Sequence, residues 1–283
     1  MDAGSVMVDP QALELGEQLG RGSSGTVTQA RDRVTGLVVA LKVVPITLRT
    51  GSEQVVQQLS ELYRSNHPHV AAFHGAAYDA QHQSVLIAFE YMDLKSLKDI
   101  LVRCGSRRIP EPVMGNCAAQ VVAGMVYLHG TRRLIHRDIK PSNVLVNSQG
   151  CFKIADFGMS KELSDTMSAG QTWVGTSSYM SPERVMGINY SFNADIWSLG
   201  IIIYECCTGQ APFGGAQTFE LLDNIVDKEP PALPEDFSNE ARHLVSICLT
   251  KDQESRPGAD ILLQHPFLLA HQGTPVLEWL RSL

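Results

Sequence analysis

The stretch IHRDIKPSNVLV, residues 135–146, decides the fold of this 283-residue chain and points to its chemistry. It contains the acid Asp138, the cation Lys140 two positions later, and the amide Asn143 three positions after that. A phosphoryl transfer to a hydroxyl needs an acceptor that orients the nucleophile, a cation on the transferred phosphate, and a metal ligand. The three side chains supply these groups in this order, so a merely structural charged turn is the weaker interpretation.

A second acid follows in KIADFGMS, residues 153–160. Asp156 comes after an apolar stretch that is typical of a strand and stands before Phe157 and Gly158. Because Mg²⁺ prefers carboxylate and phosphate oxygens, Asp156 is the expected second protein ligand of a magnesium ion beside Asn143.

A glycine-rich segment lies far upstream, in LGRGSSGTV, residues 19–27. Gly20, Gly22 and Gly25 have the spacing GxGxxG, and glycines let backbone N–H groups approach phosphate oxygens. A dinucleotide-binding loop of this spacing opens a helix, whereas the residues that follow here are typical of a strand. The pattern therefore favours a loop that covers a nucleoside triphosphate.

Lys42 lies in the apolar stretch VALKV, residues 39–43, after the glycine loop. A lysine in this position can bind the α- and β-phosphates of ATP. The alternative is a lysine at a sheet edge with its ammonium in solvent. The position after the glycine loop favours the phosphate-binding interpretation.

The two halves of the chain differ in pattern. Residues 11–92 are mainly strand-like. Short runs rich in Val, Ile and Leu predict strands at 13–20, 25–32, 36–46 and 84–92, and one helical pattern interrupts them at 52–66. The later part predicts helices at 112–130, 193–209, 217–226, 239–249 and 258–268. Strands followed by helices predict an α+β chain in two lobes, joined near residues 91–95.

Charge and composition exclude other classes of protein. The net charge is −7 and the pI about 5.7, which argues against nucleic-acid binding. No apolar run has the length of a signal peptide or a membrane span. The six cysteines lack metal-ligand spacing, so we expect reduced thiols in a cytoplasmic protein without a membrane or nucleic-acid partner.

The four motifs occur in the order typical of protein kinases, and the chain resembles that family from about Leu15 to Phe267. The resemblance implies a bilobal kinase fold with an N-terminal extension at 1–14, an N-lobe at 15–92, a C-lobe at 93–270 and a tail at 271–283. It implies that Glu183 and Arg256 form a structural ion pair.

The resemblance also implies the cofactors ATP and Mg²⁺. Asp138 would orient the acceptor hydroxyl, Lys140 would neutralise the γ-phosphate, and Asn143 and Asp156 would hold Mg²⁺. The implied ATP-binding residues are Leu19, Gly20, Gly22, Gly25, Val27, Ala40, Lys42, Glu90, Met92 and Asn143, of which Glu90 and Met92 would bind adenine through their backbone.

Within the kinases, the phrase VGTSSYMSPERVMG, residues 174–187, resembles the mitogen-activated protein (MAP) kinase kinases. Members of that group phosphorylate Thr and Tyr in the activation loop of a MAP kinase. The tail TPVLEWLRSL, residues 274–283, is similar to their C-terminal docking segment, so residues 275–282 would bind an upstream MAP kinase kinase kinase through Val276, Leu277, Trp279 and Leu280. The alternative is a helix that simply packs on the C-lobe.

In that group two activating phosphosites lie between the DFG and SPE segments, and Thr166 and Thr172 occupy the corresponding positions. A phosphate adds roughly two negative charges and can order a loop by pairing with a cation. Arg137, next to Asp138, is the expected partner, with Lys161 as a further candidate. Thr166 and Thr172 are therefore predicted to form an activating switch.

One position departs from the family pattern. Active kinases pair the strand lysine with a glutamate of the small-lobe helix, but the corresponding residue here is Gln58, and the nearest carboxylate is Glu61. Either Glu61 reaches Lys42, or the enzyme works with a weakened contact between Lys42 and this helix, or it is a poorly active scaffold.

A Ser/Thr kinase outside the MAP kinase cascade is the other alternative for the function of the chain.

Overall fold

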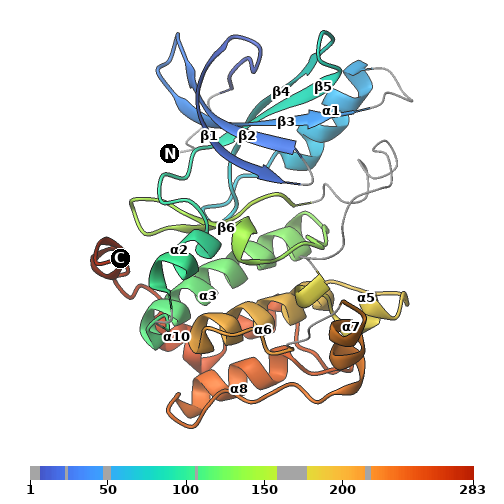
Figure 1. Cartoon of the computed structure of the whole chain (residues 1–283), viewed down its shortest axis with the longest axis vertical. Coiled ribbons are helices and arrows are strands. Elements are labelled where there is room, and N and C mark those ends of the chain that lie inside the picture. The colour runs from blue at the N-terminus through green and yellow to red at the C-terminus, as the bar shows by residue number, and fades with distance from the viewer. Residues whose placement is uncertain (1–6, 23–24, 47–51, 106–107, 158–176, 214–217) are drawn as a thin grey trace. The chain divides into compact units, whose positions relative to one another are not determined.

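The computed structural model describes residues 7–22, 25–46, 52–105, 108–157, 177–213 and 218–283. The chain divides into two compact units, one formed by Met1–Asp93 with Phe157–Thr172 and the other by Leu94–Asp156 with Trp173–Leu283. Figure 1 shows strands gathered in the first unit and most helices in the second. Each unit is described by itself below.

The first unit is built on a five-stranded antiparallel sheet in the order β1-β2-β3-β5-β4. The strands are β1 (Leu13–Gly22), β2 (Gly25–Asp32), β3 (Val38–Pro45), β4 (Phe73–Asp79) and β5 (Ser84–Glu90). Helix α1 (Ser52–Tyr63) packs against β4. The strand-like segments predicted from the sequence correspond to β1, β2, β3 and β5, whereas β4 was not predicted.

Strands β3 and β5 lie inside this sheet and carry its core. Val39 and Val44 of β3 and Val85 and Ile87 of β5 are fully buried. An aromatic cluster adds to the core, because the ring of Tyr63 on α1 lies 5.0 Å from that of Phe89 and 5.3 Å from that of Phe157. Lys42 therefore emerges from the most buried part of the sheet.

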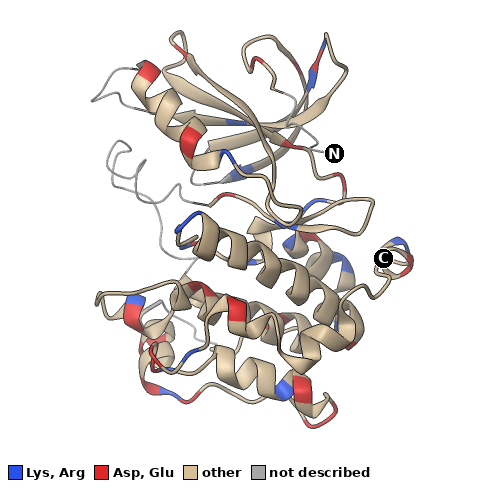
Figure 2. Ribbon diagram, turned by 180° about the vertical axis from the view of Figure 1, so that it is seen from behind, with Lys and Arg blue, Asp and Glu red and all other residues tan. Residues whose placement is uncertain are grey.

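The second unit is mainly helical. Its longest helices, α3 (Glu111–Val126) and α6 (Asn193–Thr208), are almost completely buried and carry few charged residues (Figure 2). The others are α2 (Leu97–Cys104), α5 (Pro182–Val185), α7 (Thr218–Asp227), α8 (Asn239–Cys248), α9 (Ala259–Leu262), α10 (Pro266–His271) and α11 (Leu277–Arg281), with a small hairpin of β6 (Val144–Val146) and β7 (Phe152–Ile154). Among the described helices, none has the length and apolar character to cross a bilayer.

The predicted helix at 258–268 is wrong in one respect, since the chain forms two short helices there. Proline has no N–H to donate and disfavours helical geometry in the residue before it. His265, just before Pro266, is accordingly extended, with φ −66° and ψ 135°. Its ring nitrogen accepts the N–H of Phe267 at 3.2 Å and caps α10. Pro266 therefore ends one helix and starts the next.

Candidate active site

Asp138 is held by two neighbours from its own loop. Its Oδ2 lies 2.8 Å from Nζ of Lys140 and accepts a hydrogen bond of 2.9 Å from Nδ2 of Asn143. The same Nδ2 donates to the backbone carbonyl of Asp138 at 2.8 Å. The other oxygen, Oδ1, is buried and has no hydrogen-bond partner among the described residues. One oxygen is therefore fixed, and the other is left as an acceptor.

The loop that carries Asp138 is anchored by Asp195 on α6. The buried Asp195 carboxylate accepts the backbone N–H groups of His136, at 2.8 Å, and Arg137, at 2.9 Å, and lies 2.8 Å from Nε2 of His129. Burial raises the pKa of Asp195, but the hydrogen bond and charge of His129 outweigh it, and the net pKa lies below its usual value. An ionised carboxylate thus fixes the backbone next to Asp138.

Arg137 has the left-handed backbone conformation, with φ 71°. Such a conformation costs a non-glycine residue roughly 1–2 kcal/mol. The bond to Asp195 and a hydrogen bond of 2.7 Å from Nη1 of Arg184 to the Arg137 carbonyl hold it in place. Nε of Arg137 is buried without a partner among the described residues, which suits this guanidinium for binding an anion.

His136 connects the loop to the strand that precedes Asp156. Its Nδ1 accepts the N–H of Asp138 at 3.2 Å, so its Nε2 carries the proton and donates to the carbonyl of Ala155 at 2.9 Å. Burial lowers the pKa of His136, which keeps the ring neutral in this arrangement. The carbonyl of Asn143 in turn accepts the N–H of Ala155 at 2.9 Å. Asn143 and Asp156 are thereby held at the same open end of the β6–β7 hairpin.

The donor set at this end fits a magnesium ion. Asn143 donates through its amide nitrogen, so its amide oxygen is the atom available to a cation, and Asp156 adds a carboxylate. Mg²⁺ in phosphate-transfer sites binds one or two such oxygens and completes its shell with phosphate and water. Among the described residues no group of three or more His, Cys, Asp or Glu side chains can hold a metal, so a site made by protein ligands alone is not found there.

In the first unit, the three glycines of the loop have different surroundings. Gly25 has φ +130°, and a Cβ on it would lie 2.1 Å from the backbone oxygen of Val43. Only glycine allows β2 to pass β3 so closely. A Cβ on Gly20 would meet nothing within 4 Å. Gly22 pairs with Gly25 at the end of the β1–β2 ladder. The open side of Gly20 is the feature expected of a phosphate-covering loop.

We expect Gly25→Ala and Gly20→Ala to affect different properties of the protein. Gly25→Ala should lower the free energy of unfolding by about 1–3 kcal/mol from backbone strain alone, because the added Cβ meets the Val43 carbonyl. Gly20→Ala should leave stability nearly unchanged and weaken ATP binding. Urea unfolding and nucleotide titration of both variants measure this contrast. Equal stability of the two variants would contradict it.

Lys42 lies in β3 opposite Val27 of β2 and Ile87 of β5, and it is only 2% exposed. The alternative of an edge lysine with its ammonium in solvent is therefore wrong. Gln58 and Glu61 on α1 both have exposed side chains, and Glu61 accepts a hydrogen bond of 3.0 Å from Nε2 of Gln57. The roles expected for Lys42 and Gln58 remain predictions.

The other predicted ATP-binding residues of this unit lie on the same sheet or just beyond it. Leu19 is on β1, Val27 on β2 and Ala40 on β3, and all three side chains are partly exposed. At the end of β5, the N–H of Glu90 donates to the carbonyl of Ala72 at 2.9 Å. Met92, just beyond the strand, is buried.

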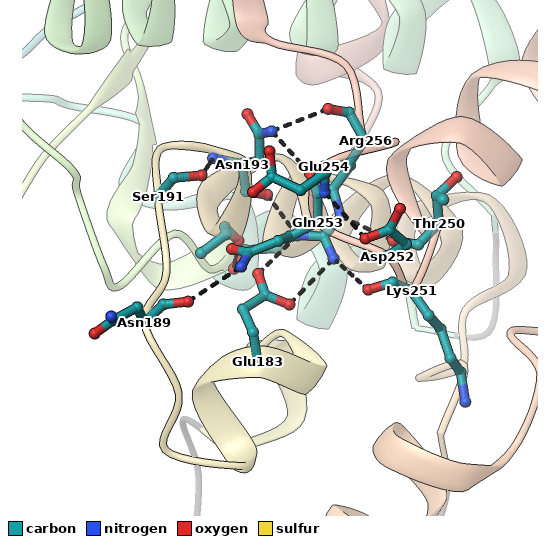
Figure 3. Close-up of polar contacts among 12 residues, drawn as sticks. Glu183, Asn189, Ser191, Asn193, Thr250, Lys251, Asp252, Gln253, Glu254 and Arg256 are labelled. Carbon is teal, nitrogen blue, oxygen red and sulfur yellow. Dashed lines mark hydrogen bonds and ion pairs between the residues drawn. The ribbon is translucent and has the colours of Figure 1, made fainter.

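The implied ion pair of Glu183 and Arg256 is confirmed. Arg256 Nη1 lies 2.8 Å from Glu183 Oε1 and Nη2 lies 3.2 Å from Oε2, with both side chains buried (Figure 3). Burial raises the pKa of Glu183, but the hydrogen bonds and charge of Arg256 hold it below its usual value. Arg256 also stacks over Trp197, with Cζ 5.2 Å from the ring centre. Thr166, Thr172 and Lys161 lie outside the described residues.

Stability should fall in mild acid because two histidines are kept neutral by the fold. Burial lowers the pKa of His136, and burial together with the nearby His243 lowers that of His265. Below the ordinary value of 6.5, the unfolded chain then binds protons that the folded chain does not. The free energy of unfolding should fall by about 1 kcal/mol per pH unit for each histidine that stays neutral.

Urea unfolding at pH 7.5, 6.5 and 5.5 measures this slope. His265→Asn is the matched control, because asparagine still offers an oxygen to the Phe267 N–H but does not titrate. Its slope should be smaller than that of the wild type. An equal slope would show that His265 does not contribute.

Comparison with protein families matches residues 13–268 to the protein kinase domain. Mitogen-activated protein kinase kinase 2 of Arabidopsis thaliana is 39% identical over 265 residues, which cover 90% of this chain and 72% of that protein. The dual specificity mitogen-activated protein kinase kinase dSOR1 of Drosophila melanogaster is 39% identical over an alignment of 288 positions, which covers 92% of this chain and 71% of that protein.

Dual specificity mitogen-activated protein kinase kinase 1 of Dictyostelium discoideum is 33% identical over an alignment of 373 positions, which covers 97% of this chain but 56% of that protein. These matches confirm the predicted fold class, with a strand-rich N-lobe and a helical C-lobe. They also confirm the resemblance to dual-specificity kinases of the MAP kinase cascade. The individual site residues are not tested by them and remain predictions.

Proposed function

Because the chain belongs to the protein kinases, and within them to the mitogen-activated protein kinase kinases, we propose that it phosphorylates Thr and Tyr in the activation loop of a MAP kinase. The phosphoryl donor of a protein kinase domain is ATP. The reaction moves the γ-phosphoryl group to a protein hydroxyl, with Mg²⁺ as the metal.

The observation that carries this proposal is the arrangement of the two oxygens of Asp138. Oδ2 is fixed by Lys140 and Asn143, and Oδ1 is buried without a partner among the described residues. An unpaired buried carboxylate oxygen is costly, so a site that keeps one is built to accept a hydrogen bond from another molecule. The acceptor hydroxyl of the substrate supplies that hydrogen bond and is oriented for attack.

The other residues have roles in binding charge. Lys140 neutralises the γ-phosphate as it is transferred, and Lys42 binds the α- and β-phosphates. Asn143 and Asp156 hold Mg²⁺, which screens the phosphate charge when it is bound. The backbone of Glu90 and Met92 binds adenine, and the loop of Gly20, Gly22 and Gly25 covers the phosphates.

Activation is by phosphorylation of Thr166 and Thr172. A phosphate on this segment needs a cationic partner to order it. Arg137 supports this role, since its backbone is held rigidly by Asp195 and Arg184 while its Nε has no partner among the described residues. We expect the phosphorylated form to be the more active one.

The tail is the proposed contact with an upstream MAP kinase kinase kinase. Val276 and Leu280, two of the predicted docking residues, are only 3% and 5% exposed. Their burial supports the alternative interpretation, in which the tail helix packs on the C-lobe. Leu277 and Trp279 are partly exposed. An upstream kinase would therefore bind the outer side of α11 or displace the helix.

The test is a transfer assay with radiolabelled ATP and a catalytically dead MAP kinase that carries a Thr-x-Tyr loop. Wild type is compared with Thr166→Glu/Thr172→Glu and with the same variant carrying Asp138→Ala. Label on both Thr and Tyr that rises in the double variant and disappears without Asp138 supports the proposal. This result would also show that the enzyme is active with Gln58 at the position where other kinases have a glutamate.

Two other results favour the alternatives. Label on a generic protein but not on the Thr-x-Tyr loop points to a Ser/Thr kinase outside the cascade. If no form of the protein transfers phosphate, the scaffold is favoured. Gln58→Glu, which restores the glutamate of the family pattern, is then the first variant to assay for activity. The scaffold has one specific observation in its favour, the exposed side chain of Gln58 on α1.

A further inference from the structure

A chain of hydrogen bonds links the C-terminal tail to the β6–β7 hairpin through two side chains of α3. Nδ2 of Asn116 donates to the carbonyl of Thr274 at 2.6 Å, and Oδ1 of Asn116 accepts from Nε2 of Gln120 at 3.2 Å. Nε2 of Gln120 also donates to the carbonyl of Gly150 at 3.4 Å, while its Oε1 accepts the N–H of Phe152 at 2.8 Å. We call Asn116 and Gln120 the amide relay.

The tail touches the same hairpin a second time, at its turn. Gly150 has φ +77°, and a Cβ there would lie 2.8 Å from Cγ2 of Val276 and 3.3 Å from Cδ2 of Leu277. Val276 is buried in this contact. The tail therefore rests directly on the turn, and it reaches the first residue of β7 through the relay.

The other end of this hairpin carries the proposed magnesium ligands. In the ladder, Val146 pairs with Phe152 and Val144 with Ile154. Directly beyond it, the carbonyl of Asn143 accepts the N–H of Ala155, just before Asp156. The ladder is only three residue pairs long. Because packed segments move as rigid units, a displacement of the turn should also displace the end that carries the metal ligands.

We propose that Asn116 and Gln120 are positioning residues for the magnesium site, and that the docked tail sets the hairpin's position through them. This inference rests on the proposed function, because it assigns a role toward the metal that phosphoryl transfer needs. Neither amide touches the metal ligands; they act through β7. Burial fits this role, since Asn116 is 6% exposed and its hydrogen bonds are shielded from water.

The test measures Mn²⁺ binding to the full chain by electron paramagnetic resonance, with a non-hydrolysable ATP analogue present. Asn116→Ala removes the bond to Thr274. Val276→Ser/Leu280→Ser loosens the tail while leaving the relay residues in place. Each should weaken Mn²⁺ binding about 2- to 30-fold, the usual range for coupling between separated sites. Combining them should weaken Mn²⁺ binding at least as much as either change alone, because the tail contacts the hairpin both through the relay and at Gly150.

Asn193→Ala is the matched control. Asn193 is also an amide of the second unit, with Nδ2 donating to the carbonyls of Gln253 and Arg256, but none of these bonds reaches the hairpin. It should lower the thermal midpoint without changing the Mn²⁺ dissociation constant. If Asn116→Ala behaves in the same way, the relay has only a structural role and the inference is wrong.

The same experiment separates failure of the inference from failure of the proposed function. If the wild type binds Mn²⁺ with the nucleotide analogue and the relay variants bind it equally well, only the inference fails. If the wild type binds no Mn²⁺ with the analogue, the proposed metal site fails and the inference with it.

Discussion

Asp138→Asn should reduce kcat by roughly 10²- to 10⁴-fold, the usual contribution of a positioned acid–base group. The substitution preserves the size and shape of the side chain, and the amide oxygen can still accept the hydrogen bond from Asn143. The buried position of Oδ1 then holds an NH₂ group that donates instead of accepting. The acceptor hydroxyl therefore loses the group that orients it.

The measurement is steady-state transfer to the dead MAP kinase, together with thermal unfolding. The Michaelis constant for ATP should change little, because the phosphate-binding residues are untouched. Asp252→Asn serves as control, since this carboxylate is exposed and accepts hydrogen bonds from the Glu254 N–H at 3.3 Å and the Ser255 hydroxyl at 2.6 Å. A kcat for Asp138→Asn within a few-fold of the wild type would contradict the proposed role of Asp138.

The loop around Asp138 could be predicted from the sequence because its chemistry is local. Asp138, Lys140 and Asn143 lie within six residues and contact one another directly. The anchoring of this loop could not be predicted in the same way. Asp195 and His129 are 66 residues apart in sequence, and their contact depends on how α6 packs in the fold.

Strand β4 shows the same limit. Its sequence FHGAAYD is rich in small residues and lacks the alternation that marks a strand. The structure gives the reason for Gly75, since a Cβ there would lie 2.4 Å from the carbonyl oxygen of Val8. The N-terminal segment around Val8 packs across β4, and the Val8 N–H donates to the carbonyl of His74 at 2.8 Å. A glycine that is required by a residue far away in sequence leaves no strand pattern in the residues around it.

The helix break at Pro266, in contrast, had a local signal, the proline itself, which the helical periodicity of 258–268 concealed.

Gly25 is a third case. Its place in the GxGxxG spacing predicts phosphate binding, whereas the structure shows a packing reason in the close approach of Val43. A motif residue can thus satisfy the fold and the site at once, and sequence spacing does not separate the two.

The largest loss of stability is expected for Arg256→Met, about 3–5 kcal/mol. Arg256 and Glu183 have side chains that are 0% and 3% exposed, so removing the cation leaves a carboxylate buried without its counter-charge. The guanidinium also donates to the carbonyls of Thr250, Asn193 and Lys251, which would lose these hydrogen bonds (Figure 3). The methionine stem keeps much of the volume packed against Trp197, so the loss reports mainly on charge and hydrogen bonding.

Urea unfolding of three variants measures this effect. Glu183→Leu/Arg256→Met should be more stable than Arg256→Met alone, because the second change removes the stranded charge. Arg33→Met is the surface control, since Arg33 and Glu14 form an ion pair at 3.5 Å with side chains 71% and 58% exposed, and it should leave stability nearly unchanged. If Arg256→Met costs no more than Arg33→Met, the buried pair does not hold the C-lobe together. If the double variant is less stable than the single one, the loss comes from the carbonyls rather than from the stranded carboxylate.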